Sequence, residues 1–274
     1  MKRMFMILTG ISMAFTSMAQ DDSTSTERVD TIRIGSMIII KKNDPNQKHD
    51  DHEWSWKRKE YKPQNLTTNW WIVDIGISQM NDNTNYPQSI ANGYLAAGAN
   101  EDWFNQRNLK STNVNIWPFM QRLNLVKHII NLKYGVGIEL NNYKYTENIK
   151  FNKTKTPLVQ MAADTFTKNK IAADYITVPM MINFNFTPTR KHGFGISVGV
   201  SAGYLYSSRQ KVVGYSAGKQ KYYDDFDMRP WKISYIAEMA LGPVKLYGSY
   251  ATQSMFEHAL DQTPYNFGLR LSNW

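Results

Sequence analysis

The chain of 274 residues contains no cysteine, so disulfide bonds and a thiol-linked lipid anchor are both excluded. Beyond the first twenty positions it also lacks any run of about 20 apolar residues, which a membrane-spanning helix requires. Mean hydropathy is low, at −0.50. A transmembrane β-barrel is compatible with that low average, because its inner face and loops dilute the apolar outer face.

The amino terminus has the pattern of a cleaved secretory signal. Lys2 and Arg3 precede an apolar stretch from Met4 to Phe15, and small residues including Ala19 follow. We therefore expect a signal peptide over residues 1–19 and an exported protein. The formal charge of +9 points to acidic partners. For an exported chain these are outer-membrane lipid and lipopolysaccharide, and we expect no nucleic acid partner.

Residues 20–68 carry many charges of both signs and no long alternation, so we expect a mostly disordered periplasmic tail. Within it, the segment 31–42 (TIRIGSMIIIKK) favours a short strand. This strand is either an apolar patch in a linker or an edge that pairs with the sheet of a periplasmic or outer-membrane protein. The residues expected to bind such a partner are Ile32, Ile34, Met37, Ile38, Ile39 and Ile40.

Two stretches, Tyr175–Phe186 and Phe194–Tyr206, hold a period of two over their whole length. Strands of soluble proteins usually have about 5–6 residues, whereas a tilted strand that crosses lipid needs roughly 9–11. In the first stretch Ile176, Val178 and Met180 share one face, and Thr177 lies on the other. These stretches predict membrane-spanning strands with apolar residues outward.

Eight such strands can be placed, with long and short connections in alternation, as in outer-membrane barrels. We therefore predict an all-β fold, an eight-stranded antiparallel transmembrane β-barrel over residues 69–274, in the outer membrane and with both termini periplasmic. The predicted strands are Asn69–Met80, Thr112–Leu123, His128–Asn142, Ala173–Phe186, Phe194–Ser207, Met228–Leu241, Val244–Thr252 and Pro264–Trp274.

Aromatic residues near the strand ends predict two girdles at the water–lipid boundaries. Trp70, Trp71 and Trp274 fall at predicted periplasmic ends. The outer ends hold Tyr143, Tyr145, Tyr175, Tyr204, Tyr206 and Trp231. Pro118 and Pro179 oppose the prediction locally, because each removes a ladder donor from mid-strand. If Pro179 faces inward, lumenal water or a side chain can satisfy the orphaned carbonyl.

Several charged residues fall at inward positions of the predicted strands. An eight-stranded lumen has room for side chains only, and an unpaired buried charge costs several kcal/mol. We expect these residues to form an ion-pair network in the lumen, in which Glu139 and Glu238 each contact a cation. The seven residues are Asp74, Lys133, Glu139, Lys232, Glu238, Lys245 and Arg270.

Motifs for catalysis or metal binding are weak. Gly199–Gly203 matches G-x-S-x-G around Ser201, but a continuing strand does not give the required strand-to-helix turn. His49-Asp50-Asp51-His52 offers metal ligands without a scaffold. We therefore expect no catalytic residues, no cofactor and no metal site. The alternatives are a small porin or transporter of ten or more strands, or an outer-membrane protease or lipid-modifying enzyme with a cleft joining His258 to Asp224, Asp225 or Asp227.

Five segments resemble the outer-membrane β-barrel family of the Bacteroidota, the PorT-like barrels of unassigned or secretion-associated role. They are DTIRIGSMIIIKK (Asp30–Lys42), Asn69-Trp70-Trp71, YITVPMMINFNF (Tyr175–Phe186), GFGISVGVSAGYLYS (Gly193–Ser207) and YNFGLRL (Tyr265–Leu271). The resemblance implies no catalytic residues. It agrees with a non-enzymatic structural or interaction module, as part of an envelope secretion or assembly complex, with loops and tail as the working parts. We also expect the lysine-rich loop Tyr143–Ala172 to associate with lipopolysaccharide.

Overall fold

The computed structural model describes residues 30–34, 37–41, 62–190, 192–216 and 218–272. The chain divides into two compact units, Met1–Lys57 and Arg58–Trp274. Among the described residues, none of the helices is long and apolar enough to cross a membrane. The signal peptide predicted over 1–19 and the motif at 49–52 lie outside the described residues.

In the first unit, strand β1 (Asp30–Ile34) pairs antiparallel with β2 (Met37–Lys41). The register places Asp30 opposite Lys41 and Ile34 opposite Met37. The short β segment predicted over 31–42 is present, and it consists of two strands that pair with each other. Each strand of such a pair keeps one edge whose backbone groups the hairpin itself does not satisfy.

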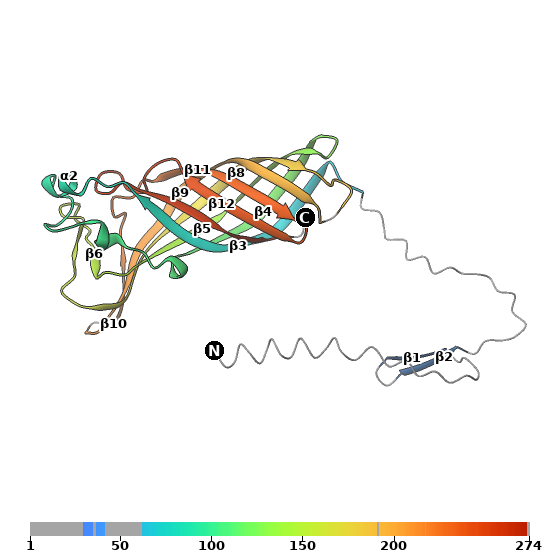
Figure 1. Cartoon of the computed structure of the whole chain (residues 1–274), viewed down its shortest axis with the longest axis horizontal. Helices are drawn as coiled ribbons and strands as arrows, with labels where there is room; N and C mark the ends of the chain where they lie inside the picture. Colours follow the sequence, from blue (N-terminus) through green and yellow to red (C-terminus); the bar gives the residue numbers. More distant parts are fainter. Residues whose placement is uncertain (1–29, 35–36, 42–61, 191, 217, 273–274) are drawn as a thin grey trace, which may run out of the picture. The chain divides into compact units, whose positions relative to one another are not determined.

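The second unit is a closed ring of antiparallel strands (Figure 1). Consecutive ring strands pair with each other, and β13 pairs with β3 to close the ring. The predicted eight-stranded antiparallel barrel is confirmed. The ring consists of β3 (Leu66–Asp82), β4 (Thr112–Val126), β5 (Ile130–Tyr145), β8 (Phe166–Asn185), β9 (Phe194–Gly214), β11 (Trp231–Leu241), β12 (Val244–Ala251) and β13 (Gln262–Leu271).

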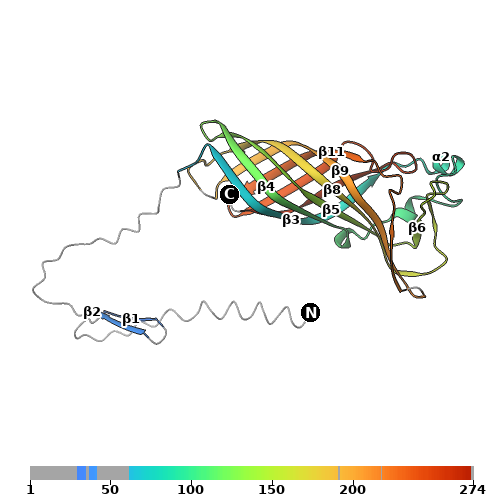
Figure 2. The same ribbon diagram turned by 180° about the vertical axis from the view of Figure 1, so that it is seen from behind.

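The two ends of the barrel differ in their connections. At the turn end, residues 127–129, 186–193 and 242–243 join the strands. At the loop end, residues 83–111, 146–165, 215–230 and 252–261 make much longer connections. Figure 2 shows α2 and β6 gathered at the loop end, and Figure 1 shows β10 there as well. The last described strand, which follows the connection 252–261, finishes at the turn end.

The alternating sequence produces an apolar outer surface. Ile176, Val178 and Met180 on β8 are 48%, 50% and 55% exposed, whereas Thr177 and Met181 between and beside them are buried. Because successive strand residues point to opposite faces, each strand places its apolar set outward and its small or polar set in the lumen. An outer surface of this kind suits contact with hydrocarbon.

A paired irregularity near the turn end accommodates one of the prolines. The β3–β4 ladder passes from Trp70–Phe119 to Ile72–Trp117, so Trp71 and Pro118 are skipped. Trp71 has a φ of 60°, and the β4–β5 ladder also shifts beside Pro118. The missing N–H of Pro118 therefore falls where the ladder is already interrupted. The irregularity also turns both Trp70 and Trp71 outward.

The second proline, Pro179, is buried on the inner face of β8 and lines a lumenal cavity. Its partner on β9 is Ser201. On the other side, the β5–β8 pairing steps directly from Tyr134–Met180 to Gly137–Thr177, so it omits Pro179. The residue thus lies where one ladder is locally open.

Several strands extend further at the loop end than expected. The bounds of two predicted connections were wrong. Within Tyr143–Ala172, β5 continues to Tyr145 and β8 begins at Phe166. Within Ser208–Asp227, β9 continues to Gly214 and pairs with β10 (Gly218–Tyr223). The outward residues of these extensions include lysines. Their polarity ends the apolar alternation while the backbone ladder continues, so the hydropathy pattern stops before the strand does.

The aromatic residues at the loop end divide into two groups. Tyr204 and Trp231 are about half exposed and their rings contact edge to face at 5.1 Å between centroids, as expected for a girdle. In contrast, Tyr143, Tyr145 and Tyr175 are at most 2% exposed. Their assignment to the girdle was wrong, because they lie at inward positions that the loops cover. Trp274, assigned to the turn-end girdle, lies outside the described residues.

The long connections form a folded cap with an apolar core, which we call the loop-end cap. Phe151 lies at its centre, with ring centroids 5.9 Å from Phe226 and 6.1 Å from Phe256. Three separate connections therefore contribute to one cluster. The short elements of the cap are α2 (Tyr86–Ala91), started by Asn85 as N-cap, η2 (Glu101–Phe104), η3 (Asn108–Lys110), β6 (Ile149–Phe151) and β7 (Val159–Met161).

Candidate functional site

Buried ion pairs occupy the lumen between the two ends. Arg270 on β13 donates from Nε to Asp74 Oδ1 at 2.7 Å and from Nη1 to Glu238 Oε2 at 2.6 Å. The other oxygen of Glu238, Oε1, contacts Lys133 Nζ at 2.6 Å. All four side chains come from different strands and have an exposure of 6% or less. Each charge thus has an oppositely charged neighbour within hydrogen-bond distance.

A second centre lies around Glu139 on β5. Its Oε1 contacts Lys232 Nζ and accepts hydrogen bonds of 3.1 Å from the side-chain amides of Asn141 and Asn266. The Lys232 ammonium also lies 4.4 Å from the ring centroid of Tyr175. Polar groups surround this carboxylate, and their contacts offset the free-energy cost of burying its charge.

Neutral side chains complete the lumenal network, and the sequence analysis did not identify them. Trp117 Nε1 donates to Asp74 Oδ2 at 2.7 Å, and Asn115 donates to the same oxygen at 3.2 Å. Ser78 donates to Asn266 at 2.6 Å. The sequence could have indicated them, because these asparagines and serines occupy inward positions of their strands. We call this whole set, together with the ion pairs, the lumenal lattice.

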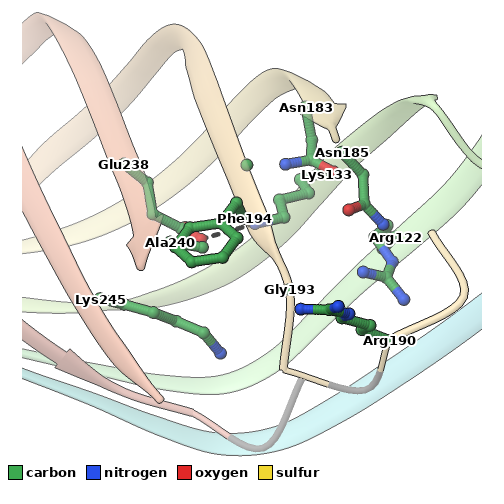
Figure 3. Close-up of a pocket in the computed structure, with 11 residues that line it drawn as sticks. Arg122, Lys133, Asn183, Asn185, Arg190, Gly193, Phe194, Glu238, Ala240 and Lys245 are labelled. Carbon is green, nitrogen blue, oxygen red and sulfur yellow. Dashed lines mark hydrogen bonds and ion pairs between the residues drawn. The ribbon is translucent and has the colours of Figure 1, made fainter. Parts of the chain in front are cut away.

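Lys245 lies closer to the turn end than the other predicted lumenal residues. Its Nζ lies 3.4 Å from the carbonyl oxygen of Ser272 and also contacts the Ser272 hydroxyl. Figure 3 shows the pocket that it lines together with Glu238, Lys133 and Arg122. The structure therefore places all seven predicted charges in the lumen. Ion pairs join six of them, and Lys245 shares a pocket with Glu238 and Lys133.

The space left inside the lattice is small. The cavity beside Glu238 and Lys245 and the cavity beside Asp74 and Glu139 each leave about 30 Å³ for water. A single water needs roughly 10–15 Å³ on this scale. Each of the two cavities therefore has room for only a few waters.

At the loop end, the structure brings Asp227 and His258 together. Asp227 Oδ1 lies 2.9 Å from His258 Nδ1, and Oδ2 accepts the backbone N–H groups of His258 at 2.8 Å and Ala259 at 3.1 Å. Lys155 Nζ lies 3.2 Å from Oδ1. Burial alone would raise the pKa of Asp227, but these donors hold it below its usual range. The Asp227 carboxylate thus links three connections of the cap through its hydrogen bonds and its ion pair.

Only one of the three aspartates considered for an outer cleft contacts His258 among the described residues. Asp224 instead caps the N–H of Asp225, and its carbonyl oxygen accepts the Ser208 hydroxyl. The ring of His258 stacks on Tyr94, with centroids 6.0 Å apart. Its side chain is 53% exposed, so the imidazole is accessible to solvent.

Glu257 joins Asp227 and His258 as a third group with a metal-ligating atom, all three atoms lying within 4.8 Å of one another. The Glu257 Oε2 to His258 Nδ1 distance is 4.0 Å. Lys155 already places an ammonium beside Asp227 Oδ1. The positive charge at this position is therefore supplied by the chain itself.

Ser201 lies in the middle of β9, and its strand continues to Gly214. It is 5% exposed and pairs with Ser234 on β11. A nucleophilic serine of the G-x-S-x-G type requires a sharp strand-to-helix turn. The motif is therefore a coincidence of inward small residues on one strand.

Comparison with known families gives one clear result. The family model described as the outer membrane protein beta-barrel domain matches residues 71–257. None of the curated proteins matches the chain. The matched segment runs from β3 through β12 and into the connection before β13. Because this match covers most of the ring and agrees with its antiparallel strand order, the chain belongs to the outer membrane β-barrel family and is an outer-membrane protein.

Proposed function

We propose that the protein is a closed, non-enzymatic outer-membrane barrel that acts as a structural and interaction module, in the manner of the PorT-like barrels of the Bacteroidota. The observation that carries this proposal is the lumenal lattice. Buried pairs such as Arg270 with Asp74 and Glu238 occupy the space through which a porin would pass solute. Its working parts are then the outer surface, the loop-end cap and the tail.

The proposed orientation places the loop end outside the cell and both termini in the periplasm. Long connections outside and short turns inside are the usual arrangement of bacterial outer-membrane barrels. In this orientation the loop-end cap meets lipopolysaccharide, and the hairpin of β1 and β2 meets periplasmic proteins. Neighbouring outer-membrane lipid contacts the apolar outer surface.

The proposed contact of the tail is a protein of an envelope secretion or assembly complex, bound through a free edge of the β1–β2 hairpin. A two-stranded hairpin leaves one edge of each strand without a backbone partner from the hairpin, and addition of a strand satisfies those groups. The apolar residues Ile38 and Ile40 lie on β2.

Planar-bilayer recordings test the closed lumen. The native protein should give no stable conductance steps, whereas a variant with Asp74, Glu238 and Arg270 all changed to Ala should give them, because those side chains fill the lumen. Regular steps from the native protein would support the porin alternative and overturn the closed module.

Co-purification from solubilised outer membrane tests the tail. Ile38→Asp with Ile40→Asp should remove the partner without affecting heat-resistant barrel folding. A matched control, Ser23→Asp with Ser25→Asp, adds the same charge to the tail outside the hairpin. Loss of barrel folding with an unchanged set of partners would show that the segment is structural.

One observation favours a second candidate, an outer-membrane hydrolase. Asp227 and His258 are placed like the acid and base of a catalytic pair, and the imidazole is open to solvent. The purified protein should release no fatty acid or peptide product from outer-membrane lipids and proteins. Turnover that disappears in His258→Ala would replace the first proposal with this one.

A further inference from the structure

Four lysines lie side by side across four strands at the loop end. Lys144 on β5 is opposite Lys170 on β8, which is opposite Lys211 on β9, which is opposite Lys221 on β10. We call these four residues the lysine row. Adjacent strands are about 4.8 Å apart, so the row extends over roughly 14 Å.

The lysine row faces outward. Its neighbours along the strands, Tyr143, Ile171 and Val212, are at most 2% exposed and point inward. Since alternate residues of a strand point to opposite faces, the lysines occupy the outer wall. Lys168 and Lys219 lie two residues from row members on the same face and widen the positive surface.

This arrangement is unfavourable for the protein alone, because like charges directly opposite on neighbouring strands repel each other. Burial, reinforced by Lys168, Lys211 and Arg209, lowers the pKa of Lys170 to about 8. The pKa of Lys211 is lowered as well, first by Lys219. A surface with only a structural role would gain stability from fewer cations here.

The lysine row lies beyond the aromatic girdle, on the side of the lipid head groups. Tyr206 belongs to the exposed aromatic residues of β9, and Lys211 follows it by five positions. At about 3.3 Å per residue and a tilt of about 40°, that distance places the row roughly 12 Å beyond the girdle. The row therefore lies outside the hydrocarbon, and the four-carbon stems of its lysines let the ammonium groups reach back toward the head groups.

We propose that the lysine row binds the phosphate groups of lipopolysaccharide in the leaflet around the loop end. The inference rests on the proposed function for its orientation, since lipopolysaccharide must surround this end. Repulsion among four ammonium groups is relieved when anionic phosphates lie between them. The extension of β5, β8 and β9 beyond the apolar wall and the addition of β10 are what bring the four lysines together.

The test measures binding of the full-length barrel, in detergent, to purified lipopolysaccharide and to the same material after its phosphates are removed. Lys170→Gln with Lys211→Gln should weaken binding about 25-fold at low salt, about fivefold for each lysine. Lys62→Gln with Lys127→Gln, two exposed lysines at the turn end, should stay within twofold. Removing the phosphates should reduce native binding to the level of the row variant.

The melting temperature separates binding from folding, because the row variant should melt at the native temperature or above it. Equal binding by native and row variants, or equal binding of phosphate-free material, would overturn the lysine row as a site. Labelling of single cysteines on intact cells tests the orientation. Thr154→Cys should react with an impermeant reagent and Thr189→Cys should not; the reverse would overturn the orientation and lipopolysaccharide as the phosphate source.

Discussion

The lumen and the outer face at the loop end arrange their charged side chains in opposite ways. In the lumen, Arg270 lies between Asp74 and Glu238, so every contact in that group joins opposite signs. On the outer face, Lys170 has a lysine opposite it on each side. The ion pairs in the lumen stabilise the barrel. The lysines on the outer face repel one another, and an anionic ligand would relieve that repulsion. Among the described residues, the first arrangement joins opposite charges and the second sets like charges opposite one another.

The largest effect should follow from breaking the lumenal lattice at its centre. Arg270→Leu leaves the carboxylates of Asp74 and Glu238 buried without their shared cation, which costs about 3–5 kcal/mol. Urea unfolding of the folded barrel, followed by tryptophan fluorescence, measures the loss. Arg190→Leu at the exposed turn end serves as control and should change the free energy of unfolding by less than about 0.5 kcal/mol. A loss below 1 kcal/mol for Arg270→Leu would contradict the structural role.

A double-mutant cycle at the second centre should give a smaller effect. Glu139→Leu leaves Lys232 as a buried cation without its carboxylate and should cost about 3 kcal/mol. Adding Lys232→Met should recover most of that loss, because two apolar side chains replace a buried pair at little cost. The free energy of unfolding of all four proteins gives the coupling. Additive losses would show that the two residues do not act as a pair.

The loop-end cap should respond locally to the loss of one carboxylate. Asp227→Asn weakens the contacts to His258, Ala259 and Lys155, so amide exchange over 252–261 should become about tenfold faster while the barrel strands keep their protection. Asp225→Asn is the control, because among the described residues the native Asp225 side chain accepts the backbone N–H of Asp227 and no hydrogen bond from the other connections. Equal acceleration in the strands would mean that Asp227 supports the whole barrel.

The pH dependence of the cap follows from the lowered pKa of Asp227. A carboxyl whose pKa is lower in the folded state stabilises that state above its unfolded pKa, about 3.9, and loses this effect as pH falls through the folded value. The contribution of Asp227 to the protection of 252–261 should therefore decline below about pH 4. Asp227→Asn should remove this decline, and a decline of equal size in the variant would assign it to another group.

The smallest effect has the opposite sign. Lys170→Gln should raise the free energy of unfolding by a few tenths of a kcal/mol, because it removes repulsion from Lys144 and Lys211. The pKa of Lys170 is lowered to about 8, so the unfolded chain binds more protons between about pH 8 and 10, and native stability should rise across that range. This rise should be smaller in Lys170→Gln and unchanged in Lys153→Gln. A destabilised Lys170→Gln protein would argue against repulsion in the row.

The ring could be predicted from the sequence, because apolar residues at every second position show which face of each strand contacts lipid. The same parity placed Glu139 and Glu238 in the lumen. It could not say that Glu238 would contact both Lys133 and Arg270, because partners across a lumen depend on how the ring closes and on the stagger of its strands. The alternation along a strand predicts whether a side chain points inward or outward. A contact between two side chains also depends on their positions along the barrel axis.

The loop-end cap was beyond sequence reasoning for a different reason. Phe151, Phe226 and Phe256 belong to three connections and follow no common period, so nothing marks them as neighbours. The pairing of Asp227 with His258 was considered, because both fall in connections at one end of the barrel. The strand extensions were missed, since lysines interrupt the apolar pattern without interrupting the backbone ladder.

The folded cap has a consequence for any molecule that recognises the loop end, such as an antibody or a bacteriophage. Phe151, Phe226 and Phe256 hold three connections against one another, so a recognised surface there combines segments far apart in the sequence. Epitopes at this end are therefore discontinuous. Short peptides copied from a single connection would reproduce only a fragment of such an epitope, and antisera raised against them should bind the denatured chain better than the folded barrel.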